Sequence, residues 1–119
     1  MPQIIIHAWI EFADAATRDE AIRLTAPIQW RTRTEEPGCL EYAFAADPCV
    51  PNRVTIHELW EDHASVLAHF VHPCYEQMRD ALVGLKPTAL WNRLYEVGRD
   101  CPVYPDGGGT RTTLFEDRI

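Results

Sequence analysis

One carboxylate, Glu58, interrupts an otherwise apolar strand face and is the first candidate for acid–base chemistry. It alternates with Ile56 and Trp60, so these three side chains are predicted to point to the same side of the strand. A carboxylate there either pairs with an arginine, such as Arg23 or Arg79, or occupies a cavity where burial raises its pKa. A structural ion pair and a catalytic acid or base both fit the pattern.

The second candidate is His69, which falls on a predicted helix. It shares a stripe with Val66 and Phe70, so its imidazole is predicted to point inward. An inward imidazole is either a buried structural histidine or a proton acceptor. As a catalytic pair, His69 is the expected base or hydrogen-bond partner of a substrate, and Glu58 orients it or is the alternative base.

Large side chains are predicted to surround the same space and to bind a substrate. Such stripes also form ordinary cores, but a pocket for a flat ring needs walls of this kind. The expected lining residues are Trp30, Trp60, Phe70, Tyr75 and Met78, with Tyr42 on the facing strand as a hydroxyl donor.

A cluster of possible metal ligands follows the second candidate. His69 and His72 could share a helix face, but Pro73 redirects the chain before Cys74. His63 is predicted to lie nearly opposite His69 on the helix. The sequence also contains no dinucleotide, P-loop or flavin motif, so neither a metal site nor a cofactor is predicted.

Four segments alternate apolar and polar residues in the manner of β-strands. They are residues 3–12, 40–45, 54–60 and 89–98, and turn residues separate the second from the third. These two central segments therefore predict an antiparallel hairpin.

Two helices are predicted between the strands. Thr17 opens a capping box, so the first helix is expected over 17–34, with a kink at Pro27. The second is expected over about 62–84, with a pause at Pro73. The resulting order, βαββαβ, predicts an α+β ferredoxin-like fold: a four-stranded antiparallel sheet with two helices on one face.

The other face of this sheet has no predicted cover. It carries Trp9 and Leu59, together with Trp91 and Tyr95. An apolar patch of this kind on a small protein is commonly covered by a second copy, so a homodimer packed sheet to sheet is expected.

The central segments carry a resemblance as well. EPGCLEYAF, DP-x-x-PNR and HELWED, followed by a histidine on the next helix, resemble the antibiotic biosynthesis monooxygenase domain family, over about residues 3–98. The resemblance implies a dimeric α/β barrel with a cleft between sheet and helices, where Glu58 would lie. In family members that oxidise phenols, a histidine at the position of His69 belongs to the cleft lining. Relatives that break down haem carry other residues at the positions of Ala8, His69 and Arg79, so no haem is expected.

Length and charge limit the remaining possibilities. The 119 residues predict a domain over 1–98 and a C-terminal extension over 99–119 that is flexible or packs on the partner subunit. A net charge of −7 without a basic block argues against nucleic acid and anionic membranes as partners. No signal peptide or membrane span is apparent, so a cytoplasmic location is expected.

The resemblance implies a cofactor-independent monooxygenase that oxidises an aromatic phenol or quinol with O₂. The expected partners are thus a small aromatic substrate, O₂ and a second copy of the chain. One alternative is a non-catalytic small-molecule-binding or dimerisation module of the same fold, which a cleft filled by Trp30 and Trp60 would favour. Another is an isomerase or lyase of the same barrel type that uses His69 as a base.

Overall fold

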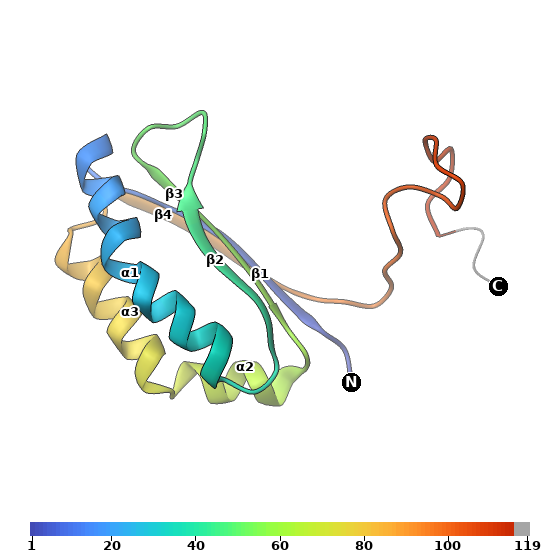
Figure 1. The fold of residues 1–119 in the computed structure, drawn as a ribbon, viewed down its shortest axis with the longest axis horizontal. Helices are drawn as coiled ribbons and strands as arrows, with labels where there is room; N and C mark the ends of the chain where they lie inside the picture. Colours follow the sequence, from blue (N-terminus) through green and yellow to red (C-terminus); the bar gives the residue numbers. More distant parts are fainter. Residues whose placement is uncertain (116–119) are drawn as a thin grey trace.

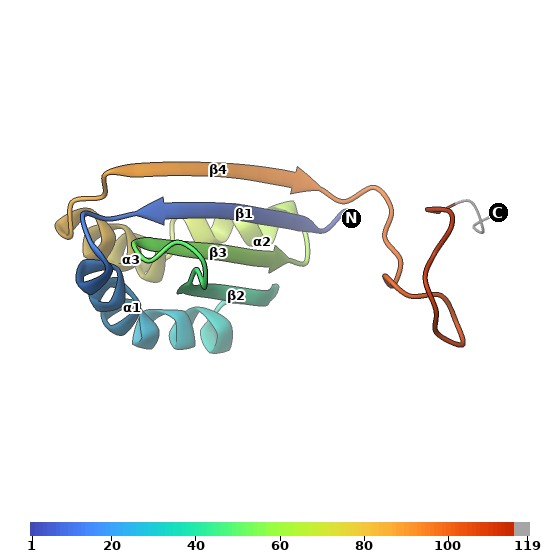
Figure 2. The same cartoon turned by 90° about the horizontal axis from the view of Figure 1, so that it is seen from above.

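Four strands and three helices make up the body of the computed structural model, which describes residues 1–115. In chain order they are β1 (Ile4–Glu11), α1 (Ala15–Glu35), β2 (Cys39–Ala46), β3 (Arg53–Trp60), α2 (His63–Phe70), α3 (Pro73–Gly84) and β4 (Ala89–Glu96). The strands form one antiparallel sheet in the order β2-β3-β1-β4, and the helices lie on one of its faces (Figures 1 and 2). The predicted ferredoxin-like fold is confirmed.

Helix α1 begins earlier than the sequence predicted. Its N-cap is Asp14, whose carboxylate accepts hydrogen bonds from the backbone N–H and the hydroxyl of Thr17 at 2.8 and 2.7 Å. Asp14, and not Thr17, therefore caps the helix, because its carboxylate accepts from a free amide of the first turn. Thr17 is the donor in this cap. The helix continues through Pro27 and ends at the C-cap Glu36.

The connection from α1 to β2 requires a glycine. Gly38 has a φ of +83°, and a Cβ atom built on it would lie 2.0 Å from the Ser65 hydroxyl oxygen. Only glycine fits such a conformation at such close range. The start of α2, capped by Asp62, therefore packs directly against the chain that follows Glu36.

The predicted pause at Pro73 divides the second helical region into α2 and α3. Pro73 occupies the first position of α3, where its missing N–H costs no hydrogen bond. His72 is the N-cap, and its Nδ1 accepts a hydrogen bond from the N–H of Cys74 at 3.0 Å. The described residues therefore form three helices where the sequence analysis expected two.

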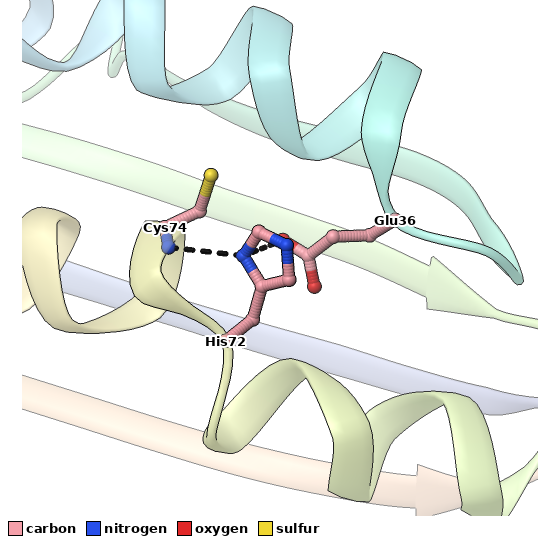
Figure 3. Close-up of side chains that lie close together, drawn as sticks. All are labelled: Glu36, His72 and Cys74. Carbon is pink, nitrogen blue, oxygen red and sulfur yellow. Dashed lines mark hydrogen bonds and ion pairs between the residues drawn. The ribbon is translucent and has the colours of Figure 1, made fainter.

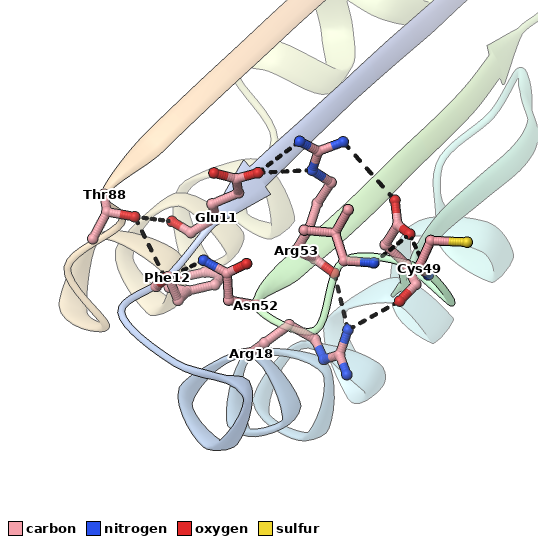
Figure 4. Close-up of polar contacts among 9 residues, drawn as sticks. Glu11, Phe12, Arg18, Cys49, Asn52, Arg53 and Thr88 are labelled. Carbon is pink, nitrogen blue, oxygen red and sulfur yellow. Dashed lines mark hydrogen bonds and ion pairs between the residues drawn. The ribbon is translucent and has the colours of Figure 1, made fainter.

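Polar contacts fix the turn of the β2–β3 hairpin against β1 and α1 (Figure 4). The Arg53 guanidinium donates to Glu11 Oε2 at 2.9 and 2.6 Å, and Arg18 donates to the carbonyl of Arg53 at 3.1 Å. Asn52 Nδ2 donates to the carbonyl of Phe12 at 2.8 Å. These contacts hold β3 in register beside β1 at this end of the sheet.

The core lies between the sheet and the helices, but it does not extend under the whole of β4. Leu90 and Leu94 remain largely exposed at this edge of the sheet. The buried apolar residues are Ile4, Ala8, Phe12, Ala21, Ile28, Tyr42, Phe44, Val54, Ile56, Trp60, Val66, Cys74, Met78 and Leu82. No helix within residues 1–115 has both the length and the apolar character needed to cross a membrane.

The C-terminal extension leaves the body beyond β4 (Figure 1). Residues 99–115 form no helix or strand. Residues 116–119 lie outside the described part of the chain, and packing of this extension on a partner subunit stays a prediction.

Candidate functional site

A cavity of about 310 Å³ opens between the sheet and α3. Most of its walls are apolar side chains of β1, β2, β3, α3 and β4, and its polar lining includes Glu58, His69, Tyr42 and Tyr75. The apolar lining residues include Ala8, Ile10, Phe44, Ile56, Met78, Leu82 and Leu90. The two predicted catalytic residues therefore line one cavity.

Glu58 projects from β3 into this cavity wall and has no arginine partner. Its side chain accepts a hydrogen bond from Trp60 Nε1 at 2.9 Å, and the residue is only 6% exposed. Burial raises the pKa of Glu58 to about 7, against the lowering effect of the Trp60 hydrogen bond and with a further rise from the charge of Glu36. Of the two predicted alternatives, the geometry of the described residues fits the cavity and not the arginine pair.

The arginines proposed as partners of Glu58 pair with other carboxylates, although Arg79 lines the same cavity as Glu58. Arg23 pairs with Glu20 along the exposed side of α1. Arg79 lies 3.9 Å from Glu76 and 3.5 Å from Asp80 on α3. Both arginines pair locally within their own helices.

His69 is buried at the end of α2, with 2% of its surface exposed. Its Nδ1 lies 2.8 Å from Oε1 of Glu36, the C-cap of α1. Burial lowers the pKa of His69, while the hydrogen bond and charge of Glu36 oppose this effect. Glu36, and not Glu58, is therefore the carboxylate that orients this imidazole.

Aromatic rings surround the imidazole. The Trp60 ring centroid lies 4.5 Å away, and the rings of Tyr42 and Tyr75 approach edge to face at 5.5 and 5.3 Å. Burial raises the pKa of Tyr42 well above its ordinary range, so its hydroxyl stays protonated. These rings fix the plane of His69 and keep bulk water away from it.

Three of the predicted substrate-binding residues, Tyr42, Tyr75 and Met78, line the cavity. Trp60 lies fully buried behind His69, and Phe70 lines a separate pocket beside Ile4. These two are not among the residues that line the cavity.

The prediction for Trp30 is wrong, because this side chain is 66% exposed. Its neighbour Gln29 points toward the sheet, where it exchanges hydrogen bonds with the backbone of Phe44 at 3.0 and 3.3 Å. Adjacent helical residues diverge, so Trp30 points outward. Neither Trp30 nor Trp60 fills the cavity.

The histidine cluster considered in the sequence does not assemble. His63 lies 2.6 Å from Glu96 on the surface, and His69 binds Glu36. A different set of donors, from Glu36, His72 and Cys74, comes together within the described residues (Figure 3).

Glu36 is the functional residue that sequence reasoning missed. Its partner His69 lies 33 residues further along the chain. The residue type does not distinguish Glu36 from its exposed neighbour Glu35. The signal in the sequence was its place just before Pro37 and Gly38, where a helix ends.

Solved structures share this architecture. A candidate antibiotic biosynthesis monooxygenase from Deinococcus radiodurans is 28% identical, with a TM-score of 0.75 over 86% of this chain and 99% of that one. A second one, from Caulobacter crescentus, is 15% identical, with a TM-score of 0.74 over 82% and 92% of the two chains. A Bacteroides thetaiotaomicron protein of unknown function, described as a possible oxidoreductase, is 17% identical, with a TM-score of 0.71 over 81% and 98%.

Sequence comparison agrees with the structural one. A search among curated proteins found no match. The sequence profile of the family described as antibiotic biosynthesis monooxygenase matches residues 4–81. This range includes β1 and both residues of the Glu36–His69 pair. This chain is therefore a member of the antibiotic biosynthesis monooxygenase family.

Proposed function

We propose that this protein is a monooxygenase that oxidises a small aromatic phenol or quinol with O₂ and without a bound cofactor. The observation that carries the proposal is the buried His69 imidazole, held by Glu36 on the wall of a mostly apolar cavity. Membership of the family and the name of the Deinococcus relative support a monooxygenase. The phenol or quinol class is what the family resemblance implies, and the largely apolar walls of the cavity are compatible with such a ring.

The first step in this proposal is proton removal by His69. Glu36 engages Nδ1, so Nε2 is the nitrogen left for a substrate hydroxyl. The pKa of His69 is lowered mainly by burial, so the imidazole is neutral near pH 7 and can accept a proton. Glu36 then stabilises the imidazolium that forms.

The cavity favours a flat apolar ring. Its volume of about 310 Å³ is at the lower end of the range of roughly 300 to 1,000 Å³ typical of ligand pockets. Apolar walls exclude water, which strengthens the interaction between the phenolate and the imidazolium. Tyr42 and Glu58 are among the polar lining residues that can orient the ring, together with Tyr75, Arg79 and Asn92.

The electrons in this reaction come from the substrate. The phenolate passes one electron to O₂, and the resulting superoxide joins the ring radical at a hydrogen-bearing carbon, ortho or para to the hydroxyl, to give a peroxide. The ring carbon then loses its hydrogen as the O–O bond breaks, leaving a quinone carbonyl and water. Conversion of C–H to C=O releases four electrons, which is what O₂ needs for complete reduction, so no external reductant enters.

Glu58 has a second role in the proposal. Because its pKa is about 7, a substantial fraction of Glu58 is protonated near neutral pH. It can therefore donate a proton to the peroxide oxygen that leaves as water. In this scheme His69 is the general base and Glu58 is the general acid.

Oxygen-electrode assays over a panel of hydroquinones and anthrones test the proposal. His69→Gln should reduce the turnover rate by about 10²- to 10⁴-fold, as expected for loss of a general base, while its amide can still bond Glu36. Trp30→Ala is the matched control, because Trp30 is exposed outside the cavity. Binding of panel members without oxygen uptake would instead favour the non-catalytic module, and anaerobic turnover would favour an isomerase or lyase.

A further inference from the structure

A second group of polar side chains lies where the end of α1 meets the start of α3 (Figure 3). Glu36, His72 and Cys74 each offer one donor atom, and these atoms all lie within 4.8 Å of one another. We propose that they form a Zn²⁺ site with one carboxylate oxygen, one imidazole nitrogen and one thiolate sulfur as ligands. The sequence predicted no metal site because Glu36 was not among the ligands considered.

The free oxygen of Glu36 is the first argument for a cation. The Glu36 side chain is 3% exposed, and its Oε1 accepts the hydrogen bond of His69. Its Oε2 is buried without a hydrogen-bond partner and lies 3.7 Å from Nδ1 of His72. A buried carboxylate oxygen without a donor is costly, and a bound cation removes that cost.

The state of His72 is the second argument. Its Nδ1 accepts the N–H of Cys74 at 3.0 Å, so this nitrogen presents a lone pair and not a hydrogen. A neutral imidazole is the form that binds metals, and this lone pair lies on the side of the ring that faces Glu36 and Cys74. A bound cation would coordinate this Nδ1 lone pair in place of the hydrogen bond from the Cys74 N–H.

The position of Cys74 suits a thiolate ligand. It is buried at the second residue of α3, a helix of 12 residues, where the free amides and the helix dipole favour negative charge. A ligand set of sulfur, nitrogen and oxygen selects Zn²⁺ over Mg²⁺ and Ca²⁺, which prefer oxygen ligands alone.

The geometry requires only a small adjustment. Zn–S bonds of about 2.3 Å and Zn–N or Zn–O bonds of about 2.0 to 2.1 Å place tetrahedral ligands roughly 3.3 to 3.6 Å apart. The three donors must therefore draw together by about 1 Å from their present limit of 4.8 Å. His72 is partly exposed, with 31% of its side chain accessible, and tetrahedral Zn²⁺ would take a fourth ligand such as water.

Local charge supports the same site. Burial, and then the charge of Glu36, raise the pKa of the nearby Cys39 thiol to about 11. The charge of Glu36 also contributes to the raised pKa of Glu58, after burial. A cation bound to Glu36 would offset this negative potential, and it would connect the metal site to His69 through one carboxylate.

Cobalt titration of the reduced, metal-free, untagged protein tests the site. One Co²⁺ per chain should bind with a thiolate-to-metal charge-transfer band and with visible bands of tetrahedral intensity, and Zn²⁺ should displace it. Cys74→Ser should lose the charge-transfer band, whereas Cys49→Ser, which changes an exposed cysteine, should keep it. Absence of the band in the unsubstituted protein, or its survival in Cys74→Ser, would overturn the proposal.

A second variant covers the case in which Cys74→Ser does not fold. His72→Asn keeps a side-chain oxygen for the N-cap but removes the imidazole ligand. It should lose most of the Co²⁺ affinity while the circular dichroism spectrum remains that of the parent protein. Unchanged affinity would exclude His72 and with it the site. These spectra do not depend on oxygen uptake, so the monooxygenase proposal stands or fails separately.

Discussion

At the scale of single residues, Glu58 makes folding depend on pH. Its pKa is about 7 in the folded chain and about 4.5 when the side chain is exposed, so the folded state holds a proton that the unfolded state releases. This group therefore lowers the free energy of unfolding as the pH rises from about 4.5 to 7, by on the order of 3 kcal/mol.

Glu58→Gln should remove most of this dependence. Denaturant unfolding at pH 5 and pH 8 should show a smaller loss of stability in Glu58→Gln than in the parent protein. The exposed Glu61→Gln is the control and should behave like the parent. Equal losses in the parent and in Glu58→Gln would contradict the assignment of a raised pKa.

The Glu36–His69 pair should show strong energetic coupling. His69→Ala and Glu36→Gln each leave a buried polar partner, so each should cost about 3 kcal/mol or more of the free energy of unfolding. The double variant should cost clearly less than the sum. The exposed His57–Glu41 pair, 2.6 Å apart, is the control and should show coupling close to zero. Additive losses at Glu36 and His69 would refute the buried pair.

Residue-scale prediction from sequence succeeded where the signal is local. The alternation around Glu58 placed it on the inner face of a strand, and the stripe around His69 placed it inward. The partner Glu36 could not be predicted, because a helix C-cap has no required side chain and its contact is tertiary. The prediction that Trp30 lines the cavity failed because its polar neighbour Gln29 is the residue buried on this side of the helix.

At the scale of elements, Gly38 controls how α1, β2 and α2 meet. Gly38→Ala should destabilise the protein by at least about 2 kcal/mol, because φ is +83° and the added Cβ would meet Ser65. Gly84→Ala is the matched control, since a Cβ there meets nothing within 4 Å. Thermal unfolding of both variants checks this, and a neutral Gly38→Ala would show that the connection can rearrange.

The elements themselves were largely predictable. Alternation located all four strands, and Pro73 marked the break between α2 and α3. The start of α1 was missed because both Asp14 and Thr17 can cap a helix, and local sequence does not decide which carboxylate or hydroxyl reaches the free amides. The resemblance implied a cleft between sheet and helices, but its volume was beyond prediction, since it depends on how far α3 stands from β4.

At the scale of the whole molecule, none of the described residues 1–115 covers the sheet face opposite the helices (Figure 2). Trp9 on this face lies under the Arg53 guanidinium at 4.3 Å, and Trp91 contacts His7 edge to face at 5.3 Å. We propose that a second copy packs here, with more than roughly 1,200 Å² of total buried area.

Sedimentation velocity at micromolar concentration checks this dimer. Leu59→Arg, on the uncovered sheet face, should raise the monomer fraction, because a buried unpaired charge opposes association. Leu67→Arg, on the exposed side of α2, is the control and should leave the dimer intact. A parent protein that sediments as a monomer, or dissociation by Leu67→Arg alone, would speak against the proposed interface.

Isotope labelling with ¹⁸O₂ tests the central claim most directly. The purified protein is supplied with a phenol or quinol of the oxygen-consuming panel, and no reductant, metal or flavin is added. The account predicts one ¹⁸O atom in the new quinone carbonyl and the other in water, with both dependent on His69. A product that takes its oxygen from water, or ¹⁸O incorporation that persists in His69→Gln, would contradict it.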